Sequence, residues 1–148
     1  MSQSATKMLP EDVSAAVQPA KKRVLVVDDF DDAREMYAEY LEFAGFLVET
    51  ARNGAEAVEK AQEASPDIIL MDLSLPVMDG WEATRLIKND IRTRDIPVMA
   101  LSGHVLAGSE NHAKEAGADE FVAKPCLPSD LEDKIRTMLK PSKAKGKR

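Results

Sequence analysis

The chain contains a single cysteine, Cys126, among its 148 residues. No intramolecular disulfide is therefore possible, and a reducing compartment is the expected setting. No apolar run approaches the roughly 18 residues that a membrane-spanning helix needs. The N-terminus also lacks the apolar core of a secretory signal peptide. These absences predict a soluble, cytoplasmic protein that makes no contact with membranes.

The chain also lacks an excess of basic residues, since its formal net charge at pH 7 is -6. A general nucleic-acid-binding protein needs a basic surface, so no nucleic-acid partner is expected. A glycine-rich phosphate loop is missing, which argues against a nucleotide ligand. The two histidines, His104 and His112, have no second imidazole or thiol at ligand spacing. This spacing argues against a zinc site.

Composition divides the chain into three regions. Residues 1–20 are rich in Ser, Ala, Gln and Pro without sustained periodicity, and we expect a disordered N-terminal tail there. Residues 21–140 contain the patterned sequence and are long enough for one domain with a proper core. Residues 141–148 are rich in lysine and are expected to form a solvated, basic C-terminal tail. Contact of this tail with an acidic protein or nucleic acid is the other interpretation.

Short apolar runs alternate with amphipathic stretches throughout the patterned region. The apolar runs predict buried strands at residues 23–27, 46–50, 68–71, 96–101 and 120–123. The stretches that follow them have apolar residues at helical spacing and predict five helices. Capping boxes at residues 53–56 and 129–132 are expected to begin two of these helices. The alternation predicts an α/β fold with a parallel sheet between helices.

Polar side chains follow most of the predicted strands, at the point where each strand ends. Asp28 and Asp29 follow the first strand, Asp72 the third, Ser102 the fourth and Lys124 the fifth. Right-handed crossovers bring the carboxyl ends of parallel strands to one edge of the sheet. We therefore expect these five residues to lie together, where open α/β sheets bind their ligands.

The chemistry of these residues favours a magnesium-dependent phosphoryl transfer. Crowded carboxylates repel one another, and hard oxygen ligands are those that Mg²⁺ prefers. A carboxylate beside Mg²⁺ and a lysine ammonium is a setting for phosphoryl transfer. Asp72 would attack in line as the nucleophile, while the metal and Lys124 offset charge on the phosphoryl oxygens. Ser102 would donate a hydrogen bond to one of these oxygens.

The motifs around these residues resemble the receiver domain of two-component response regulators. The matching segments are residues 24–29 (VLVVDD), 69–72 (ILMD), 75–80 (LPVMDG), 101–103 (LSG), 116–119 (AGAD) and 124–125 (KP). The resemblance covers about residues 21–139 and implies a stand-alone, chemotaxis-type single-domain receiver. It also implies a flavodoxin-like fold: a doubly wound five-stranded parallel sheet in the order 2-1-3-4-5, flanked by five helices.

The resemblance assigns the metal and phosphoacceptor roles to individual residues. Asp72 would accept a phosphoryl group from a phosphohistidine on a sensor histidine kinase or a histidine phosphotransfer protein. Asp29 and Asp72 would hold Mg²⁺ together with the backbone carbonyl of Ser74, and Asp28 would act mainly through water. The chain would not be an enzyme beyond its own phosphorylation and dephosphorylation.

The resemblance also implies how phosphorylation would be transmitted. Ser102 and Lys124 would bind the phosphoryl group, and the Lys124–Pro125 peptide bond would be cis. Phe121 occupies the position of the family's switch aromatic, and it has no hydroxyl, so the switch would act through packing. Ser102 would reach the phosphoryl group through movement of the loop at residues 102–108, and this movement would give Phe121 room to turn. A downstream protein would then bind the face formed by the fourth helix, fifth strand and fifth helix.

The sequence leaves two other functions open. A Mg²⁺-dependent phosphatase with an aspartyl-phosphate intermediate would want a second acid two residues beyond the nucleophile, where this chain has Ser74. A receiver-like module that binds a partner without being phosphorylated is the other alternative. The intact acidic set and Lys124 argue against that module.

Overall fold

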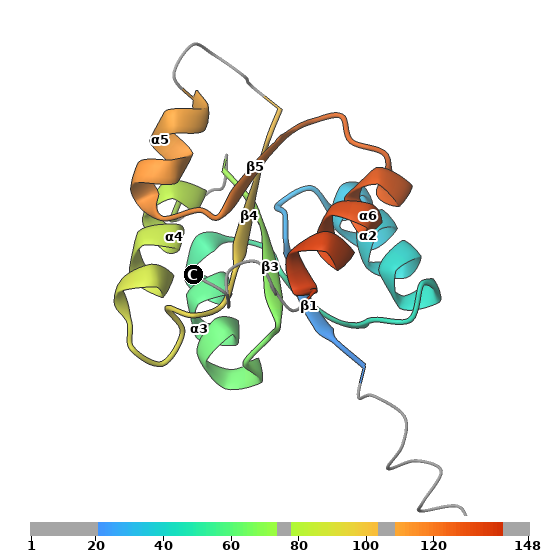
Figure 1. Cartoon of the computed structure of the whole chain (residues 1–148), viewed down its shortest axis with the longest axis horizontal. Coiled ribbons are helices and arrows are strands. Elements are labelled where there is room, and N and C mark those ends of the chain that lie inside the picture. The colour runs from blue at the N-terminus through green and yellow to red at the C-terminus, as the bar shows by residue number, and fades with distance from the viewer. Residues whose placement is uncertain (1–20, 74–77, 104–108, 141–148) are drawn as a thin grey trace, which may run out of the picture.

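A parallel sheet of five strands lies in the middle of the structure, a computed structural model that describes residues 21–73, 78–103 and 109–140 (Figure 1). The strands are β1 (Arg23–Val27), β2 (Leu47–Ala51), β3 (Ile68–Asp72), β4 (Val98–Ser102) and β5 (Glu120–Ala123). Their order across the sheet is β2-β1-β3-β4-β5, and every neighbouring pair is parallel. The predicted strand order is confirmed.

Helices cover both faces of this sheet (Figure 1). One face is covered by α2 (Asp31–Phe43) and α6 (Pro128–Leu139), and the other by α3 (Gly54–Ala64), α4 (Gly80–Asn89) and α5 (Ser109–Ala116). The doubly wound, flavodoxin-like fold is therefore confirmed, with five helices in the part of the chain that the structure describes. None of these helices has the length and apolar character of a membrane span.

The strands alternate their side chains between two apolar cores. Val24 and Val26 of β1 pack in the core beneath α2 and α6, which also contains Leu41 and Ile135. Leu25, one residue along, packs in the core on the opposite face, with side chains of α3 and α4. The middle strands β3 and β4 are fully buried because helices cover both of their faces.

Of the two predicted capping boxes, the structure confirms the one that begins α3 and contradicts the one expected at the start of α6. The Asn53 side chain accepts a hydrogen bond from the Glu56 N–H at 2.8 Å, so it caps α3 as predicted. The capping box at residues 129–132 is wrong. There, α6 begins at Pro128 and its cap residue Leu127 provides no side-chain hydrogen bond. Proline is suited to the first helical position because its fixed φ already matches a helix.

The segments for which tails are predicted, residues 1–20 and 141–148, lie outside the described residues. Their expected disorder stays a prediction.

Candidate functional site

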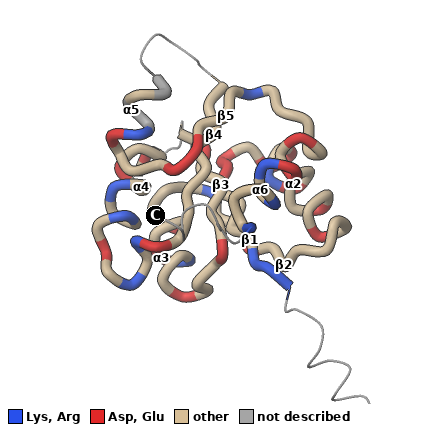
Figure 2. The backbone as a smooth tube through the Cα atoms, viewed as in Figure 1, with Lys and Arg blue, Asp and Glu red and all other residues tan. Residues whose placement is uncertain are grey.

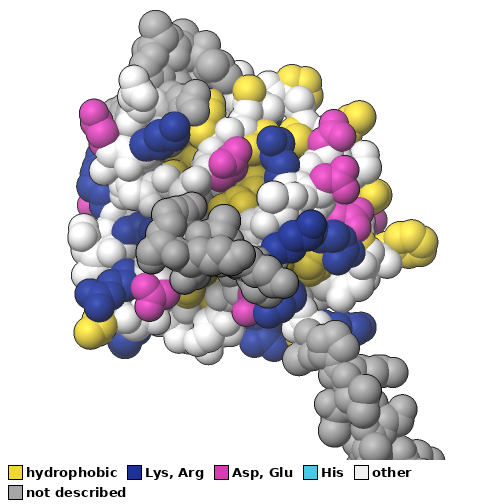
Figure 3. Space-filling model, in the orientation of Figure 1, with side chains coloured by type: hydrophobic (Ala, Val, Ile, Leu, Met, Phe, Trp, Pro, Cys, Tyr) yellow, Lys and Arg dark blue, Asp and Glu magenta, His cyan; other side chains and the backbone are white. Residues whose placement is uncertain are grey.

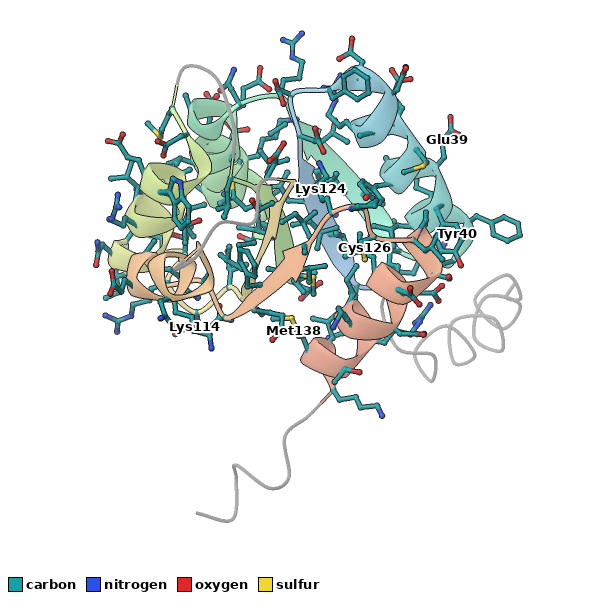
Figure 4. The ribbon with its side chains drawn as sticks, turned by 90° about the horizontal axis from the view of Figure 1, so that it is seen from above. Glu39, Tyr40, Lys114, Lys124, Cys126 and Met138 are labelled. Carbon is teal, nitrogen blue, oxygen red and sulfur yellow. The ribbon has the colours of Figure 1, made fainter. Side chains whose placement is uncertain are left out.

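The carboxyl edge of the sheet brings the predicted site residues together. Asp72 and Ser102 are the last residues of β3 and β4, while Asp28 and Lys124 directly follow β1 and β5. Figure 4 looks down on this edge and shows Lys124 above the middle of the sheet. The convergence follows from the parallel topology, which places every strand's carboxyl end on the same side.

Three carboxylates form an acidic cluster at this edge. Asp28, Asp29 and Asp72 each contribute an oxygen that lies within 4.8 Å of the others. Asp28 and Asp72 are buried, with 1% and 6% of their surface exposed, whereas Asp29 is exposed. In an octahedral Mg²⁺ site with bonds of about 2.1 Å, two ligand oxygens lie at most about 4.2 Å apart. The cluster is therefore close to the size of a Mg²⁺ site, and small adjustments of the Asp29 and Asp72 side chains would let both reach one ion.

Lys124 bridges two of these carboxylates. Its Nζ donates a hydrogen bond to Asp28 Oδ2 at 3.1 Å and lies 3.9 Å from Asp72 Oδ2. Burial lowers the pKa of Lys124, but the hydrogen bond to Asp28 and the negative charge of Asp72 outweigh it, so the pKa is raised. The ammonium group is therefore charged at neutral pH, and it offsets part of the repulsion within the acidic cluster.

Asp28 is held in place on every side. Its Oδ1 accepts a hydrogen bond from the Phe30 N–H at 3.0 Å, while Oδ2 accepts the bond from Lys124. Its backbone N–H donates to the Ala51 carbonyl at 3.1 Å. Its backbone carbonyl accepts a hydrogen bond from Arg34 Nη1 at 3.0 Å. The position of this carboxylate is thus fixed before any ion or phosphoryl group arrives.

Arg34 is a buried charged residue that the sequence analysis missed. Its guanidinium donates both to the Asp28 carbonyl and to the Asp31 carboxylate, and only 11% of its side chain is exposed. It therefore ties the turn between β1 and α2 to the helix. The signal in the sequence is an arginine among the apolar residues of the helix's inner face, one turn after Phe30.

Gly80 lets α4 begin directly against the end of β3. A Cβ at this position would lie 2.3 Å from the Asp72 carbonyl oxygen and 2.7 Å from Leu73 Cα. The Gly80 N–H donates a hydrogen bond to the Leu73 carbonyl at 3.2 Å. A side chain here would push α4 away from the end of β3, so the backbone position of Asp72 depends on this glycine.

Ser102 and Phe121 lie on the neighbouring strands β4 and β5. Ser102 is buried, and its carbonyl accepts a hydrogen bond from the Lys124 N–H at 2.8 Å. Phe121 is half-buried and pairs with Ala100 in the sheet. It packs, as does Trp81, against a small cluster formed by Leu73, Ala100 and Ala118. The predicted cis peptide bond between Lys124 and Pro125 is confirmed.

Two parts of the predicted site lie outside the described residues. Ser74, the expected backbone ligand of Mg²⁺, is one of them. The other is residues 104–108, most of the loop that is expected to move with Ser102. Their predicted roles stay predictions.

Comparison with known proteins identifies a family that matches this chain. The sequence model of the response regulator receiver domain matches residues 24–136. The polar-differentiation response regulator DivK of Brucella anthropi is 35% identical over 118 residues, which cover 80% of this chain and 96% of DivK.

Solved structures show the same similarity. The chemotaxis response regulator CheY4 of Vibrio cholerae superposes with a TM-score of 0.76 at 32% identity, covering 81% of this chain and 100% of that one. The receiver domain of the sensor histidine kinase PA1611 of Pseudomonas aeruginosa has a TM-score of 0.75 at 31% identity, with coverages of 81% and 98%. That structure is described with a magnesium ion coordinated in its active site cleft.

Proposed function

Because the chain belongs to the response regulator receiver domains of two-component signalling, we propose that it accepts a phosphoryl group on Asp72. The donor is a phosphohistidine on a sensor histidine kinase or a histidine phosphotransfer protein. The observation that supports this proposal most strongly is the acidic cluster of Asp28, Asp29 and Asp72, with the Lys124 ammonium beside it. Receiver domains use such an acidic site for signalling.

Asp72 is the best placed of the three carboxylates to be the nucleophile. Both oxygens of Asp28 accept hydrogen bonds, from Lys124 and from the Phe30 N–H. Asp29 is exposed at the rim of the cluster. Asp72 ends the central strand β3, and Lys124 lies close enough to offset charge on a phosphoryl group attached there.

The acidic cluster fits Mg²⁺, which receiver domains bind at an acidic pocket. Asp29 and Asp72 would hold the ion, Asp28 would bind mainly through water, and the Ser74 carbonyl would complete the protein ligands. When bound, the ion offsets the charge that builds up between the carboxylates and the phosphoryl oxygens.

Phosphoryl transfer exchanges one bond to phosphorus for another. An Asp72 oxygen attacks the phosphorus of the phosphohistidine, and a P–O bond forms as the P–N bond breaks. The electron pair of the P–N bond stays with the imidazole, which leaves as the neutral ring when its other nitrogen is protonated. Hydrolysis of the aspartyl phosphate by water later restores the carboxylate and releases inorganic phosphate.

Ser102 and Lys124 bind the phosphoryl group and so respond to its charge. A phosphoryl group adds about -1.5 to -2 units of charge. Moving a two-state equilibrium from 1:99 to 99:1 takes about 5.5 kcal/mol, whereas one charge-assisted hydrogen bond supplies roughly 1.5–3 kcal/mol. The Ser102 hydroxyl alone is therefore insufficient, and Lys124 contributes the remainder. The Lys124 N–H donates a hydrogen bond to the Ser102 carbonyl, which keeps the two residues side by side at the site.

The output surface is the face formed by α5, β5 and α6, the fourth helix, fifth strand and fifth helix of the predicted receiver. Movement of Ser102 toward the phosphoryl group gives Phe121 space to turn from β5. Because Phe121 packs with Trp81 on the Leu73 cluster, its rotation alters how β5 packs against α4 and α5. A downstream protein then binds the altered face.

Intact mass after incubation with a small acyl phosphate and Mg²⁺ tests the proposal. The wild type should gain the mass of one phosphoryl group, and hydroxylamine should remove it. Asp72→Asn should gain none. The matched control is Asp32→Asn, which removes an exposed carboxylate from the first turn of α2 and should label like the wild type. Full labelling of Asp72→Asn would overturn the assignment.

The same samples separate the alternative functions. Release of phosphate from unrelated phosphoesters would indicate a phosphatase. Failure of the wild type to take up phosphate would indicate a module that acts without phosphorylation. A panel of purified sensor kinases, compared at short transfer times, then identifies the donor.

A further inference from the structure

Positive charge gathers at the edge of the sheet opposite to the acidic cluster. Lys21 and Lys22 precede β1, and Lys140 follows α6 at the same end of the molecule. Figure 2 shows this basic run where the chain enters β1. All three lysines are exposed, and within the described residues none of them forms an ion pair. Their charges are therefore available to a partner.

Lys22 and Lys140 border a groove with an apolar floor, which we call the basic groove. It has a volume of about 310 Å³ and is lined by Lys22, Phe46, Arg136, Leu139 and Lys140. Phe46 is buried, with 5% of its surface exposed, whereas both lysines are exposed. Figure 3 shows Lys and Arg side chains around hydrophobic atoms on this part of the surface. The groove thus has cations at its rim and apolar side chains beneath.

Arg136 holds one wall of the basic groove rigid. Its guanidinium lies over the Phe46 ring, 4.7 Å from the ring centroid. Its Nη2 donates to the Ala44 carbonyl at 2.9 Å, and its Nε donates to Glu132 at 2.8 Å. Since Glu132 already offsets this charge, Lys22 and Lys140 are the cations that face a ligand.

We propose that the basic groove binds an acidic segment of another protein. One apolar side chain of that segment enters the groove, and carboxylates on either side of it pair with Lys22 and Lys140. Residues 1–20 are poorly suited as the occupant because their two acids, Glu11 and Asp12, are adjacent and do not lie on either side of an apolar residue.

An acidic polypeptide fits this surface better than other polyanions. A nucleic acid would pair its phosphates with the lysines but would leave the apolar floor without a partner. A bilayer surface cannot place an isolated apolar group into a concave site, and the net charge of -6 opposes attraction to anionic lipid. A peptide supplies both the carboxylates and the apolar anchor.

Binding at the basic groove leaves the acidic cluster accessible, since the two lie at opposite edges of the sheet. A partner can therefore hold this protein both before and after phosphorylation of Asp72. This binding goes beyond the proposed phosphoryl transfer and does not require it.

Fluorescence anisotropy of the unphosphorylated protein tests the groove. The probe is a fluorescein-labelled peptide in which glutamates flank one phenylalanine. Lys22→Gln combined with Lys140→Gln should weaken its binding about tenfold. The control, Arg85→Gln with Arg94→Gln, removes the same charge from exposed residues of the α4 region and should change affinity less than twofold. Replacing the peptide's phenylalanine with alanine should weaken binding severalfold, and replacing its glutamates with glutamines should abolish it.

Several results would overturn the proposal. Equal weakening by both double variants would show that only long-range attraction is involved. Equal affinity for the phenylalanine and the alanine peptides would show that no apolar side chain enters the groove. Complete loss of binding when residues 141–148 are deleted would assign it to that segment instead. Stronger binding of a DNA duplex or of phosphatidylserine vesicles, lost in the Lys22→Gln/Lys140→Gln variant, would assign the surface to those ligands. Circular dichroism of each variant verifies folding.

Discussion

The three clustered carboxylates differ in what surrounds them. Asp28 is buried and accepts hydrogen bonds from Lys124 and the Phe30 N–H, so protein groups already compensate its charge. Asp29 is exposed, and no hydrogen bond or ion pair holds its side chain within the described residues. A cation arriving from solvent therefore meets Asp29 first. Its charge destabilises the metal-free protein through repulsion of the neighbouring carboxylates.

Asp29→Ala should accordingly weaken Mg²⁺ binding without weakening the fold. The free energy of unfolding without metal should stay level or rise, because one repelling charge is gone. At a Mg²⁺ concentration of 100 times Kd, the wild type should gain about 2.7 kcal/mol of stability, and the variant should gain much less at the same concentration. Urea unfolding with and without MgCl₂ measures both quantities. The control Asp32→Ala, which also removes an exposed carboxylate, should gain as much stability from Mg²⁺ as the wild type does. A large loss of metal-free stability in Asp29→Ala would mean that Asp29 is structural.

At the scale of elements, the site depends on how closely α4 approaches the end of β3. The Gly80 Cα faces the Asp72 carbonyl, and a side chain would meet that oxygen at 2.3 Å. Such a contact cannot be relieved by rotating a side chain, because the backbone fixes the position of a Cβ and the carbonyl oxygen is itself a backbone atom. The junction must open, and the Asp72 carboxylate must move with it.

Gly80→Ala should therefore destabilise the protein by about 1–3 kcal/mol or more and slow its phosphorylation. Urea unfolding and the intact-mass assay report the two effects. Gly103→Ala is the matched stability control, because among the described residues, its chain neighbours aside, no heavy atom lies within 4 Å of the added methyl group. Its effect should stay below about 0.5 kcal/mol. Wild-type stability in Gly80→Ala would contradict the close junction.

The pairing of β4 with β5 connects the acidic cluster to the proposed output face. Ser102 ends β4 next to Ala123, and Phe121 lies on β5 opposite Ala100. Ser102→Ala should still accept phosphate on Asp72, because the hydroxyl is not the nucleophile. In the wild type, phosphorylation should change hydrogen exchange in β5 and α6. In Ser102→Ala it should leave this exchange unchanged. Equal exchange changes in both proteins would show that the coupling does not run through Ser102.

At the scale of the whole molecule, one sheet joins two cores. Leu41 belongs to the core beneath α2 and α6, and Ile87 to the core beneath α4. Adjacent residues of β1 and of β3 belong to opposite cores, so neither core can come apart while the sheet stays intact. We therefore expect the domain to unfold in one cooperative step.

Leu41→Ala tests this coupling across the sheet. A fully buried leucine truncated to alanine should cost about 2–5 kcal/mol. The only tryptophan, Trp81, lies on the other side of the sheet in α4. Its fluorescence and the far-UV circular dichroism should nevertheless lose their native signals at the same, lower urea concentration. Ile87→Ala should behave in the same way. Separate midpoints for the two signals would mean that the two faces unfold independently.

The amino-acid sequence by itself determined the order of the elements and the residues of the site. Strand and helix periodicities are local, and crossover handedness sends Asp28, Asp72, Ser102 and Lys124 to one edge. The strand order was supplied by resemblance to a family, since alternation alone permits several orders. One local signal misled: residues 129–132 have the sequence pattern of a capping box, but the helix already begins at Pro128.

Only the tertiary structure decided which groups touch. Lys124 pairs with Asp28 across 96 residues of sequence, and Arg34 turns inward to bond the Asp28 carbonyl. Gly80 is required by the carbonyl of Asp72, and the basic groove joins Lys22 to Lys140 from opposite ends of the domain. Periodicity cannot reveal such contacts, because it reports how a segment is buried and not which distant side chain lies against it. Which distant side chains come into contact is determined only when the helices pack on the sheet.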